Sequence, residues 1–362
     1  HLRVSGEDHL SLGAAEVGRA DELAVWAAAV PAEHLHRVHA EGGTKRSPLL
    51  RLAVSVALEF ATDPIDPLHL AHAVQAMADA QPSSVGLWLL VDAALLDPAR
   101  LASVLHRNGW SHINALANTP LEAYGARGPQ LVELPLDDEV RAEGLRRLAT
   151  IDPAAPAFSW IASSHAAADL QACFGYLAQA RHDGLKLHCR MGDVRVLPTL
   201  LSTLAEPQAR RVAQAISQWQ WFDRSGAVVG NWLAASGKDG VADARDHLEL
   251  DASQFATLLD ASEADGIFAQ LLETVSQLVP QTDRAAFHQR LQRALAVATR
   301  LHVAGNPDRL QFVVLSLTCG DDFYQHPDLS ATWKAVAQGT SLSGLMKGWS
   351  DELWKALEGK AS

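Results

Sequence analysis

The charged residues best placed to do chemistry in this sequence are Arg190, Asp193 and Arg195, which flank a predicted turn. An aspartate at such a position can cap the turn and pair with an arginine, which would make the group structural. The same guanidinium groups could instead grip the backbone or a carboxylate of a partner protein, because arginine binds carboxylates through two parallel hydrogen bonds. Both interpretations stay open at the level of sequence.

Nucleophile and phosphate-loop patterns fit the chain poorly. The stretch Ser236–Asp239 reads SGKD, but the preceding Gly230 is one residue too far away for a phosphate loop, and Asp239 stands where a hydroxyl would hold magnesium. No G-x-S-x-G elbow is present, so an α/β-hydrolase would have no nucleophile. His188 and Cys189 are neighbours on a predicted strand and point to opposite faces, so they cannot act as a couple.

Adjacent acids and clustered histidines complete the set of reactive groups. Asp137–Glu139 and Asp321–Asp322 hold neighbouring side chains that do not face one another, which favours capping or solvation over acid–base catalysis. The chain has 16 histidines. Two groups are closely spaced along the sequence: His34, His36 and His39, and His69 and His72. No glutamate completes an H-E-x-x-H motif. We therefore predict no catalytic residues, no metal and no cofactor, with a metal-dependent hydrolase as an alternative.

Two tryptophans give a different indication. Trp219 and Trp221 alternate on a predicted strand and so share one face. Core packing would explain them, but tryptophan and arginine are also enriched in protein-binding surfaces. The candidate partner-binding residues are therefore Arg190, Asp193, Arg195, Trp219 and Trp221.

Composition narrows the class of protein. The chain has 362 residues, a formal net charge of −12, 48% hydrophobic and 20% charged residues, as in an ordinary globular protein. No basic stripe favours nucleic acid, and no apolar run reaches the ~18 residues that would span a bilayer. The cysteines, Cys173, Cys189 and Cys319, are far apart among apolar neighbours, which favours reduced thiols and a cytoplasmic location.

The elements that must position these residues divide the chain into three parts. Residues 1–80 are predicted to be a mostly helical extension of unclear origin, either an added module or part of a partner. Residues 81–250 alternate short apolar strands with helical patterns, which predicts an α/β or α+β lobe with a mixed sheet. Residues 251–362 are predicted to form an all-helical lobe, with apolar stripes at helical spacing.

The strands and helices of the middle part have definite expected bounds. The predicted strands are Val85–Val91, Gln130–Leu134, Phe158–Ile161, Leu185–Arg190 and Gln218–Phe222. The predicted helices are Pro98–Asn108, Asp138–Ala149, Ala166–Ala180 and Pro207–Ser217. This order places Arg190 at the end of a predicted strand, and Asp193 and Arg195 in and after the turn that follows it.

The segment Leu185–Leu204, LKLHCRMGDVRVLPTLLSTL, resembles the R-[aromatic]-x-D-P-R-V-L core of the DUF4123 family. Arg190, Asp193 and Arg195 fit that pattern, as do the Val-Leu residues that follow. Val194 stands where proline is usual in the family, and the two residues after Arg190 are not aromatic.

Further segments resemble the family in the same order over roughly residues 81–356. Gly86–Arg100 is similar to its opening strand and "LvDaA" turn, and Gly128–Leu134 to its "gPwLvel" strand. Trp219–Asp223 resembles the strand that closes the lobe, and Phe312–Pro327 resembles a segment of the C-terminal lobe.

The resemblance implies a function that composition alone does not give. Members of the family are effector chaperones, or adaptors, of the bacterial type VI secretion system. The resemblance therefore implies a non-enzymatic cytoplasmic adaptor that binds a type VI secretion effector and loads it onto the VgrG spike protein. An immunity-type protein that neutralises a toxin is a further alternative.

Overall fold

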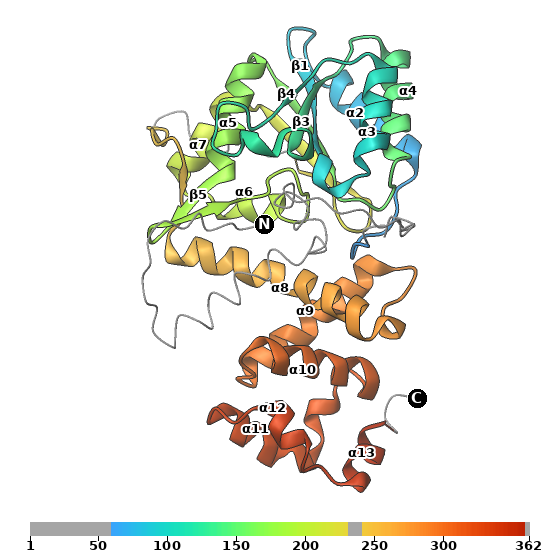
Figure 1. The fold of residues 1–362 in the computed structure, drawn as a ribbon, viewed down its shortest axis with the longest axis vertical. Helices are drawn as coiled ribbons and strands as arrows, with labels where there is room; N and C mark the ends of the chain where they lie inside the picture. Colours follow the sequence, from blue (N-terminus) through green and yellow to red (C-terminus); the bar gives the residue numbers. More distant parts are fainter. Residues whose placement is uncertain (1–58, 231–240, 359–362) are drawn as a thin grey trace, which may run out of the picture. The chain divides into compact units, whose positions relative to one another are not determined.

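The computed structural model describes residues 59–230 and 241–358 (Figure 1). These residues form two compact units that divide between Ala261 and Ser262. The predicted helical extension over residues 1–80 is described only in its last part, where α2 (Pro67–Asp79) is a helix. The predicted histidine group His34, His36 and His39 and the SGKD stretch lie outside the described residues.

The centre of the first unit is a six-stranded sheet in the order β2-β3-β1-β4-β7-β8 (Figure 1). Its strands are β1 (Gly86–Asp92), β2 (His112–Asn114), β3 (Pro129–Glu133), β4 (Phe158–Ser163), β7 (Gln218–Phe222) and β8 (Val228–Gly230). All of its pairings are antiparallel. The lobe is therefore α+β, one of the two classes that the sequence left open.

Helices cover both faces of this sheet, with α2, α3 and α4 on one side and α5 and α7 on the other (Figure 1). The helices of the lobe that follow α2 are α3 (Pro98–Asn108), α4 (Asp138–Ala149), α5 (Ala167–Ala178), α6 (Leu197–Thr203) and α7 (Glu206–Ala215). The core under the first group joins Leu70, Leu101 and Leu145 to Leu89 and Trp160 of the central strands. Burial on both faces explains why the sequence of β1, GLWLLVD, is apolar up to its last residue, Asp92.

Capping residues fix where the helices of the first face begin. Asp97 accepts a hydrogen bond from the Arg100 amide and precedes Pro98, so it caps α3 as the sequence indicates. Asp137 caps α4 in the same way through the Val140 amide. This contact gives Asp137 a structural role at the start of α4.

A smaller sheet in the order β6-β5-β9 lies in the same unit. Its strands are β5 (Gln179–His182), β6 (Leu185–His188) and β9 (Leu248–Glu249). Because β5 pairs antiparallel with β6 and parallel with β9, this sheet is mixed. The predicted helix Ala166–Ala180 ends early, at Ala178, since the Asp183–Gly184 pair turns the chain into a hairpin with φ values of 45° and 79°.

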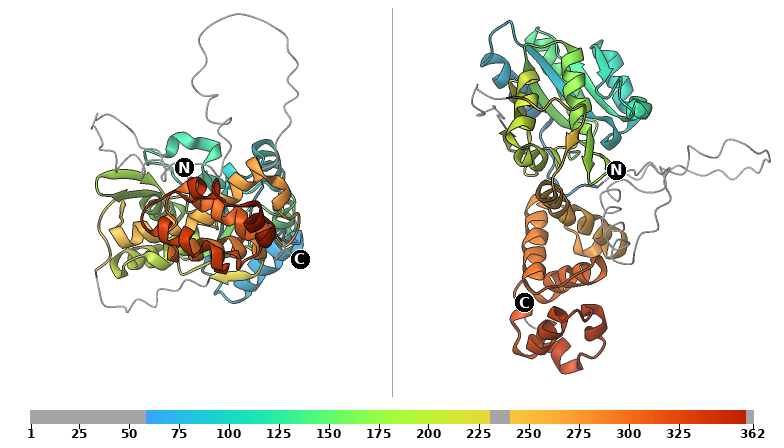
Figure 2. Two further views of the ribbon diagram at one scale, coloured as in Figure 1. Left: turned by 90° about the horizontal axis from the view of Figure 1, so that it is seen from below. Right: turned by 90° about the vertical axis from the view of Figure 1, so that its left-hand side faces the viewer.

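The second unit contains only helices among its described residues (Figure 2). They are α8 (Ala252–Thr274, which begins in the first unit), α9 (Arg284–Arg300), α10 (Asn306–Cys319), α11 (Ser330–Ala337), α12 (Leu342–Met346) and α13 (Asp351–Glu358). Short 3₁₀ turns add Ser276–Leu278, Phe323–Gln325 and Pro327–Leu329. The prediction of an all-helical C-terminal region is therefore confirmed for the described residues.

A buried aspartate organises the second unit. Asp308, in the first turn of α10, accepts hydrogen bonds from the Leu342 and Ser343 amides at 2.6 and 3.0 Å and from the Ser341 and Ser343 hydroxyls. It thereby satisfies the start of α12, whose own first amides have no partner within the helix. No helix of the described ranges is both long enough and apolar enough to cross a membrane.

Candidate functional site

The candidate site is a chain of charged side chains at one end of the main sheet. Asp92 is the last residue of β1, while Arg190, Asp193 and Arg195 come from the loop between β6 and α6. Arg190 contacts Asp92 at 2.9 Å and Asp193 at 3.9 Å. Arg195 donates to both carboxylate oxygens of Asp193, at 3.0 and 2.6 Å. We call these residues the Asp92–Arg195 network; its two carboxylates and two guanidinium groups balance in charge.

The Asp92–Arg195 network is buried. Asp92 is 4% exposed, Asp193 1% and Arg190 8%, and the side chain of Arg195 is 7% exposed. Burial acts to raise the pKa of Asp193, but Arg195 and then Arg190 oppose it and hold the pKa below its usual value. Charges taken out of water to this degree persist only when each has a partner, so this geometry favours the structural interpretation.

Local backbone contacts explain how the loop reaches the sheet. A side chain on Gly192 would place its Cβ 3.2 Å from Cβ of Asp92 and 3.4 Å from Cβ of Pro129. Asp193 also caps the turn, as the sequence suggests, because it accepts the Arg195 amide at 3.0 Å. The Val194 amide donates to the Pro156 carbonyl at 3.0 Å. A proline at position 194 could not make this bond, which gives the departure from the family pattern a physical basis.

Sequence reasoning missed Asp92 as a member of the network. The residue belongs to the quoted segment Gly86–Arg100, but it is 98 positions away from Arg190. No periodicity joins residues at such a distance. The available signal was an aspartate at the end of an otherwise apolar strand, where a buried carboxylate requires a positive partner.

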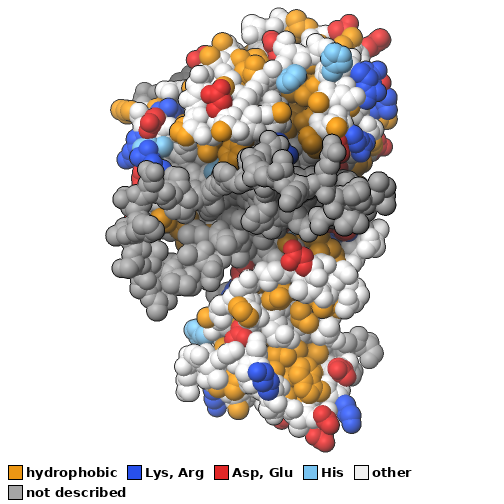
Figure 3. Space-filling view, in the orientation of Figure 1, with side chains coloured by type: hydrophobic (Ala, Val, Ile, Leu, Met, Phe, Trp, Pro, Cys, Tyr) orange, Lys and Arg blue, Asp and Glu red, His pale blue; other side chains and the backbone are white. Residues whose placement is uncertain are grey.

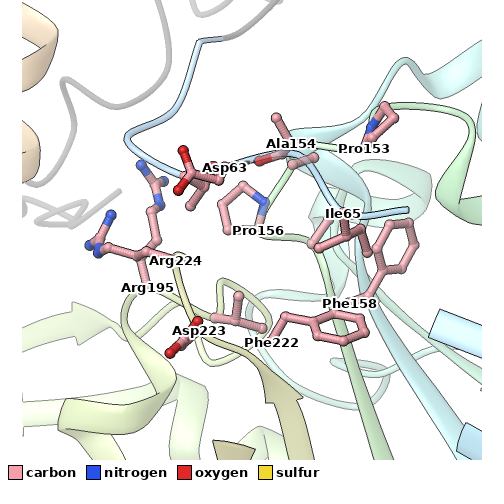
Figure 4. A pocket seen from close by; sticks show the side chains of 14 residues that line it. Asp63, Ile65, Pro153, Ala154, Pro156, Phe158, Arg195, Phe222, Asp223 and Arg224 are labelled. Atoms are coloured by element: carbon pink, nitrogen blue, oxygen red, sulfur yellow. Dashed lines mark hydrogen bonds between the residues drawn. The ribbon is translucent and has the colours of Figure 1, made fainter. Parts of the chain in front are cut away.

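A small pocket lies beside the network (Figure 4). The charged side chains of Asp63, Arg195 and Arg224 lie on one side, and the rings of Phe158 and Phe222 lie on the other. Its volume is about 30 Å³. That volume holds water but is far below the roughly 300–1,000 Å³ typical of organic ligand sites.

The network also anchors the segment that leads into the first unit. The Arg195 guanidinium lies 5.1 Å from the ring centroid of Phe60, which is 1% exposed. Nearby, the Thr62 hydroxyl donates to the Ala154 carbonyl at 2.5 Å, and the Asp63 amide donates to the Arg224 carbonyl at 2.8 Å. The residues that precede α2 are therefore held against the ends of the central strands.

The predicted tryptophan pair is buried in the sheet. Trp219 is fully buried, donates to the Ser159 hydroxyl at 3.0 Å and packs edge-on against Phe174 of α5 at 5.7 Å. Trp221 is 6% exposed and packs against the close backbone of Gly230. The structure does not bring either tryptophan to the Asp92–Arg195 network through a contact, and a partner-binding role for the pair stays a prediction.

The remaining reactive groups are dispersed. Burial raises the pKa of Cys173 and of Cys189 to about 12, so both are unreactive thiols at neutral pH. His69 packs against the ring of Phe222 at 5.0 Å. Burial, with the nearby charge of Arg190, lowers the pKa of His188 to about 3. Across residues 59–230 and 241–358, no three histidine, cysteine or acidic side chains gather as a metal site.

The second unit presents half-buried aromatic residues. Tyr324 and Trp333 line an open groove of about 440 Å³ together with Pro327. Trp349 and Trp354 lie 5.0 Å apart and pack against the core of this unit without being covered by it. Figure 3 shows apolar side chains gathered on this part of the surface. Half-buried aromatic surface of this kind is typical of protein-binding sites.

Comparison with protein families gives one match. Residues 87–211 match the model described as "Domain of unknown function (DUF4123)". The matched range contains all four residues of the Asp92–Arg195 network. It ends before Trp219–Asp223 and Phe312–Pro327, the later segments of the resemblance. Comparison with curated proteins and with solved structures gives no match.

Proposed function

The chain carries a DUF4123 domain over residues 87–211, and from this premise we propose that it is a non-enzymatic adaptor. It binds a type VI secretion effector and loads it onto the VgrG spike. A cytoplasmic location follows from this role, because the effector must be collected before it is exported.

One observation carries the proposal. The charged residues that fit the family pattern form ion pairs within the buried Asp92–Arg195 network. Their guanidinium and carboxylate groups bind one another and hold a loop on the sheet, so their role in the domain is to maintain its shape. A domain whose charged residues serve mainly to stabilise its fold is suited to binding another protein, because its surface then provides the function.

The second unit supports a protein as the partner. Trp333, Trp349 and Trp354 each offer a large aromatic face that is only partly covered. Burial of apolar surface contributes about 25 cal/mol per Å², less the cost of ordering both partners. A standard interface of roughly 1,200–2,000 Å² would hold an effector stably. Affinity depends on a few central residues more than on buried area, so an interface of this size can still be weak enough to release the effector to the spike.

The test needs a candidate effector, chosen as a toxin from among the genes next to the gene for this chain and here called the neighbouring toxin. Co-expression should raise the soluble yield of the toxin, and the two proteins should purify as a complex that also retains VgrG. Deletion of this chain should abolish secretion of the toxin. A toxin that is equally soluble and equally secreted without the chain would contradict the proposal.

Matched variants locate the contact. Trp354→Ala should weaken the complex about tenfold or more, as loss of a central aromatic residue does. Val241→Ala removes an exposed apolar side chain of the first unit (85% exposed) and should leave binding unchanged. The bound toxin should keep its enzymatic activity, whereas an immunity-type protein would abolish that activity.

A further inference from the structure

The first unit carries a local excess of positive charge on an acidic protein. The whole chain has a formal net charge of −12. Yet Lys and Arg side chains gather over α3 and α4, on the upper right of the molecule in Figure 3. The last turns of these helices hold His106 and Arg107 in α3 and Arg146 and Arg147 in α4. We call these four residues the α3–α4 basic face.

Two contacts join the helices into one surface. Arg147 donates to the Asn108 side chain at 3.4 Å, and Asn108 donates in turn to the Gly144 carbonyl at 3.3 Å. Arg107 is the chain neighbour of Asn108, so the last turns of α3 and α4, which carry the arginines, meet at Asn108. The arrangement is fixed by packing, because α4 approaches so closely that a side chain on Gly144 would overlap the ring of Trp110.

One glutamate neutralises only part of this charge. Glu143 accepts from Arg146 at 2.7 and 2.8 Å and from Arg147 at 2.9 Å. All three side chains remain about 40% exposed, at 42%, 40% and 41% for Arg146, Arg147 and Glu143. Arg107 is exposed, and its guanidinium donates a long hydrogen bond of 3.4 Å to the carbonyl of Ser103. The face therefore keeps a surplus of guanidinium donors that point to solvent.

We propose that the α3–α4 basic face is the docking surface for an acidic segment of the partner protein. Its exposed guanidinium groups match carboxylates, which they bind through paired charge-assisted hydrogen bonds. The acidic remainder of the chain repels such a segment, so charge directs it to this face. The part of the proposal that identifies the partner as the secretion effector rests on the function proposed above.

The shape of the charge distribution favours a peptide over nucleic acid. Asp138 and Glu139 occupy the first turn of α4. At 1.5 Å per residue they lie roughly 12 Å from the arginines along the helix axis. A phosphate backbone needs a continuous basic track and would meet these carboxylates, whereas a short acidic segment fits within the basic part.

The first experiment uses labelled oligo-glutamate peptide as the probe, with the full chain at low salt. Wild type should bind the peptide, and Arg107→Glu/Arg147→Glu should weaken binding about tenfold or more, with loss of most of the salt dependence. The matched control is Arg293→Glu/Arg300→Glu, which makes the same charge change at exposed positions of α9. This control should bind the peptide within about twofold of wild type, because it lies in the other unit.

Three results would overturn the proposal. They are absence of peptide binding by wild type, equal loss of binding in both double variants, and tighter binding of an oligonucleotide that depends on Arg107 and Arg147. The neutral variant Arg107→Gln/Arg147→Gln guards against misfolding. It should keep the thermal melting of wild type, since exposed ion pairs contribute about 1 kcal/mol or less, and still weaken binding severalfold.

The second experiment uses the neighbouring toxin. Arg107→Glu/Arg147→Glu should lower its association rate about tenfold and leave its dissociation rate nearly unchanged. Equal rates in this variant and in wild type would overturn the docking surface and leave the adaptor function intact. A wild-type chain that binds oligo-glutamate through these arginines but does not bind the toxin would sustain the surface and overturn the adaptor function.

Discussion

At the level of single residues, the Asp92–Arg195 network shows how burial decides the role of a charged side chain. Arg190, Asp193 and Arg195 have the chemistry to grip a partner, and a solvent-exposed turn would leave them free to do so. In the folded chain they form ion pairs with one another and with Asp92. We therefore expect these residues to affect the proposed partner binding indirectly, through the shape of the loop that they hold.

Removal of Asp193 tests this structural role. Asp193→Ala should lower the free energy of unfolding by about 3–5 kcal/mol, because both Arg190 and Arg195 would remain buried without their shared carboxylate. The matched control is Asp169→Ala, whose side chain is 60% exposed beside His165 and whose loss should cost about 1 kcal/mol or less. Urea denaturation measures both. Unchanged stability of Asp193→Ala together with lost effector binding would make Asp193 a binding residue instead.

The histidine beside the network predicts a pH dependence. Burial lowers the pKa of His188 to about 3, and its Nδ1 has no hydrogen-bond partner among the described residues. The unfolded chain binds this proton below a pKa of about 6.5 and the folded chain does not, so stability falls as the pH falls from about 6.5 toward 3. The loss amounts to about 2 kcal/mol between pH 7 and pH 5.

A variant without the titrating ring isolates this effect. His188→Gln should remove about 2 kcal/mol of the wild-type difference between pH 7 and pH 5, measured by urea denaturation at each pH. Its stability at pH 7 will also change, because the ring stacks on Tyr124 at 5.2 Å. The comparison therefore depends on the slope with pH and not on the absolute value. An identical slope in both proteins would show that His188 is protonated in the folded state.

At the level of elements, local signals in the sequence predicted most of the first unit. Strand β7 has the predicted bounds, as do helices α3 and α4, because capping aspartates and alternating apolar residues are local features. The end of α5 was harder to predict from the sequence, since the choice between helix and strand at Gln179 depends on the pairing of β5 with β6 and β9. The short strands β2 and β8 have too few residues for a pattern.

The candidate site was predictable only in part for the same reason. The turn cap at Asp193 is local and was expected, whereas the partner of Arg190 lies in a distant strand. The tryptophans of β7 share a face as predicted, but only the position of α5 shows that this face is covered. The burial and the ion-pair partners of a residue depend on its neighbours in space, so the spacing of residues along the chain could not predict them.

Two glycines within helices should respond to alanine in opposite directions. Gly144→Ala should destabilise the first unit by about 1–3 kcal/mol, because the new Cβ would overlap the Trp110 ring and lie 2.9 Å from Asn108. Gly344→Ala in α12 meets only Ser341, at 3.8 Å. That change should stabilise by up to about 1 kcal/mol, since alanine favours the helix. Thermal unfolding of both variants checks the pair, and a stabilised Gly144→Ala would mean that α4 is free to move from Trp110.

At the level of the whole molecule, each of the two units contains a hydrophobic core cluster of its own among its described residues. The first is built around the antiparallel sheet and the second around aromatic residues such as Phe312 and Phe323, whose rings lie 5.0 Å apart. Each unit also has its own buried acidic group, Asp193 in the first and Asp308 in the second. Removal of one such carboxylate should therefore destabilise its own unit first.

Loss of the Asp308 carboxylate tests this independence. Asp308→Ala removes the acceptor for the Leu342 and Ser343 amides and should cost about 2 kcal/mol. Hydrogen exchange should rise in α10 and α12 while the amides of β1 keep their protection. The variant Ser343→Ala removes one hydroxyl donor only, and should have a smaller effect in the same helices. Equal deprotection of β1 would show that the units unfold together.

The separation of Asp92 from Arg190 has a consequence for synthesis of the chain. The two residues are 98 positions apart, and a ribosome adds about 5–20 residues each second. Asp92 therefore leaves the ribosome roughly 5–20 seconds before Arg190 does. During that interval β1 can pair with β3 and β4, but the end of the strand that carries Asp92 must stay hydrated. The buried ion pair at this end of β1 can form only after the loop that contains Arg190 has been made.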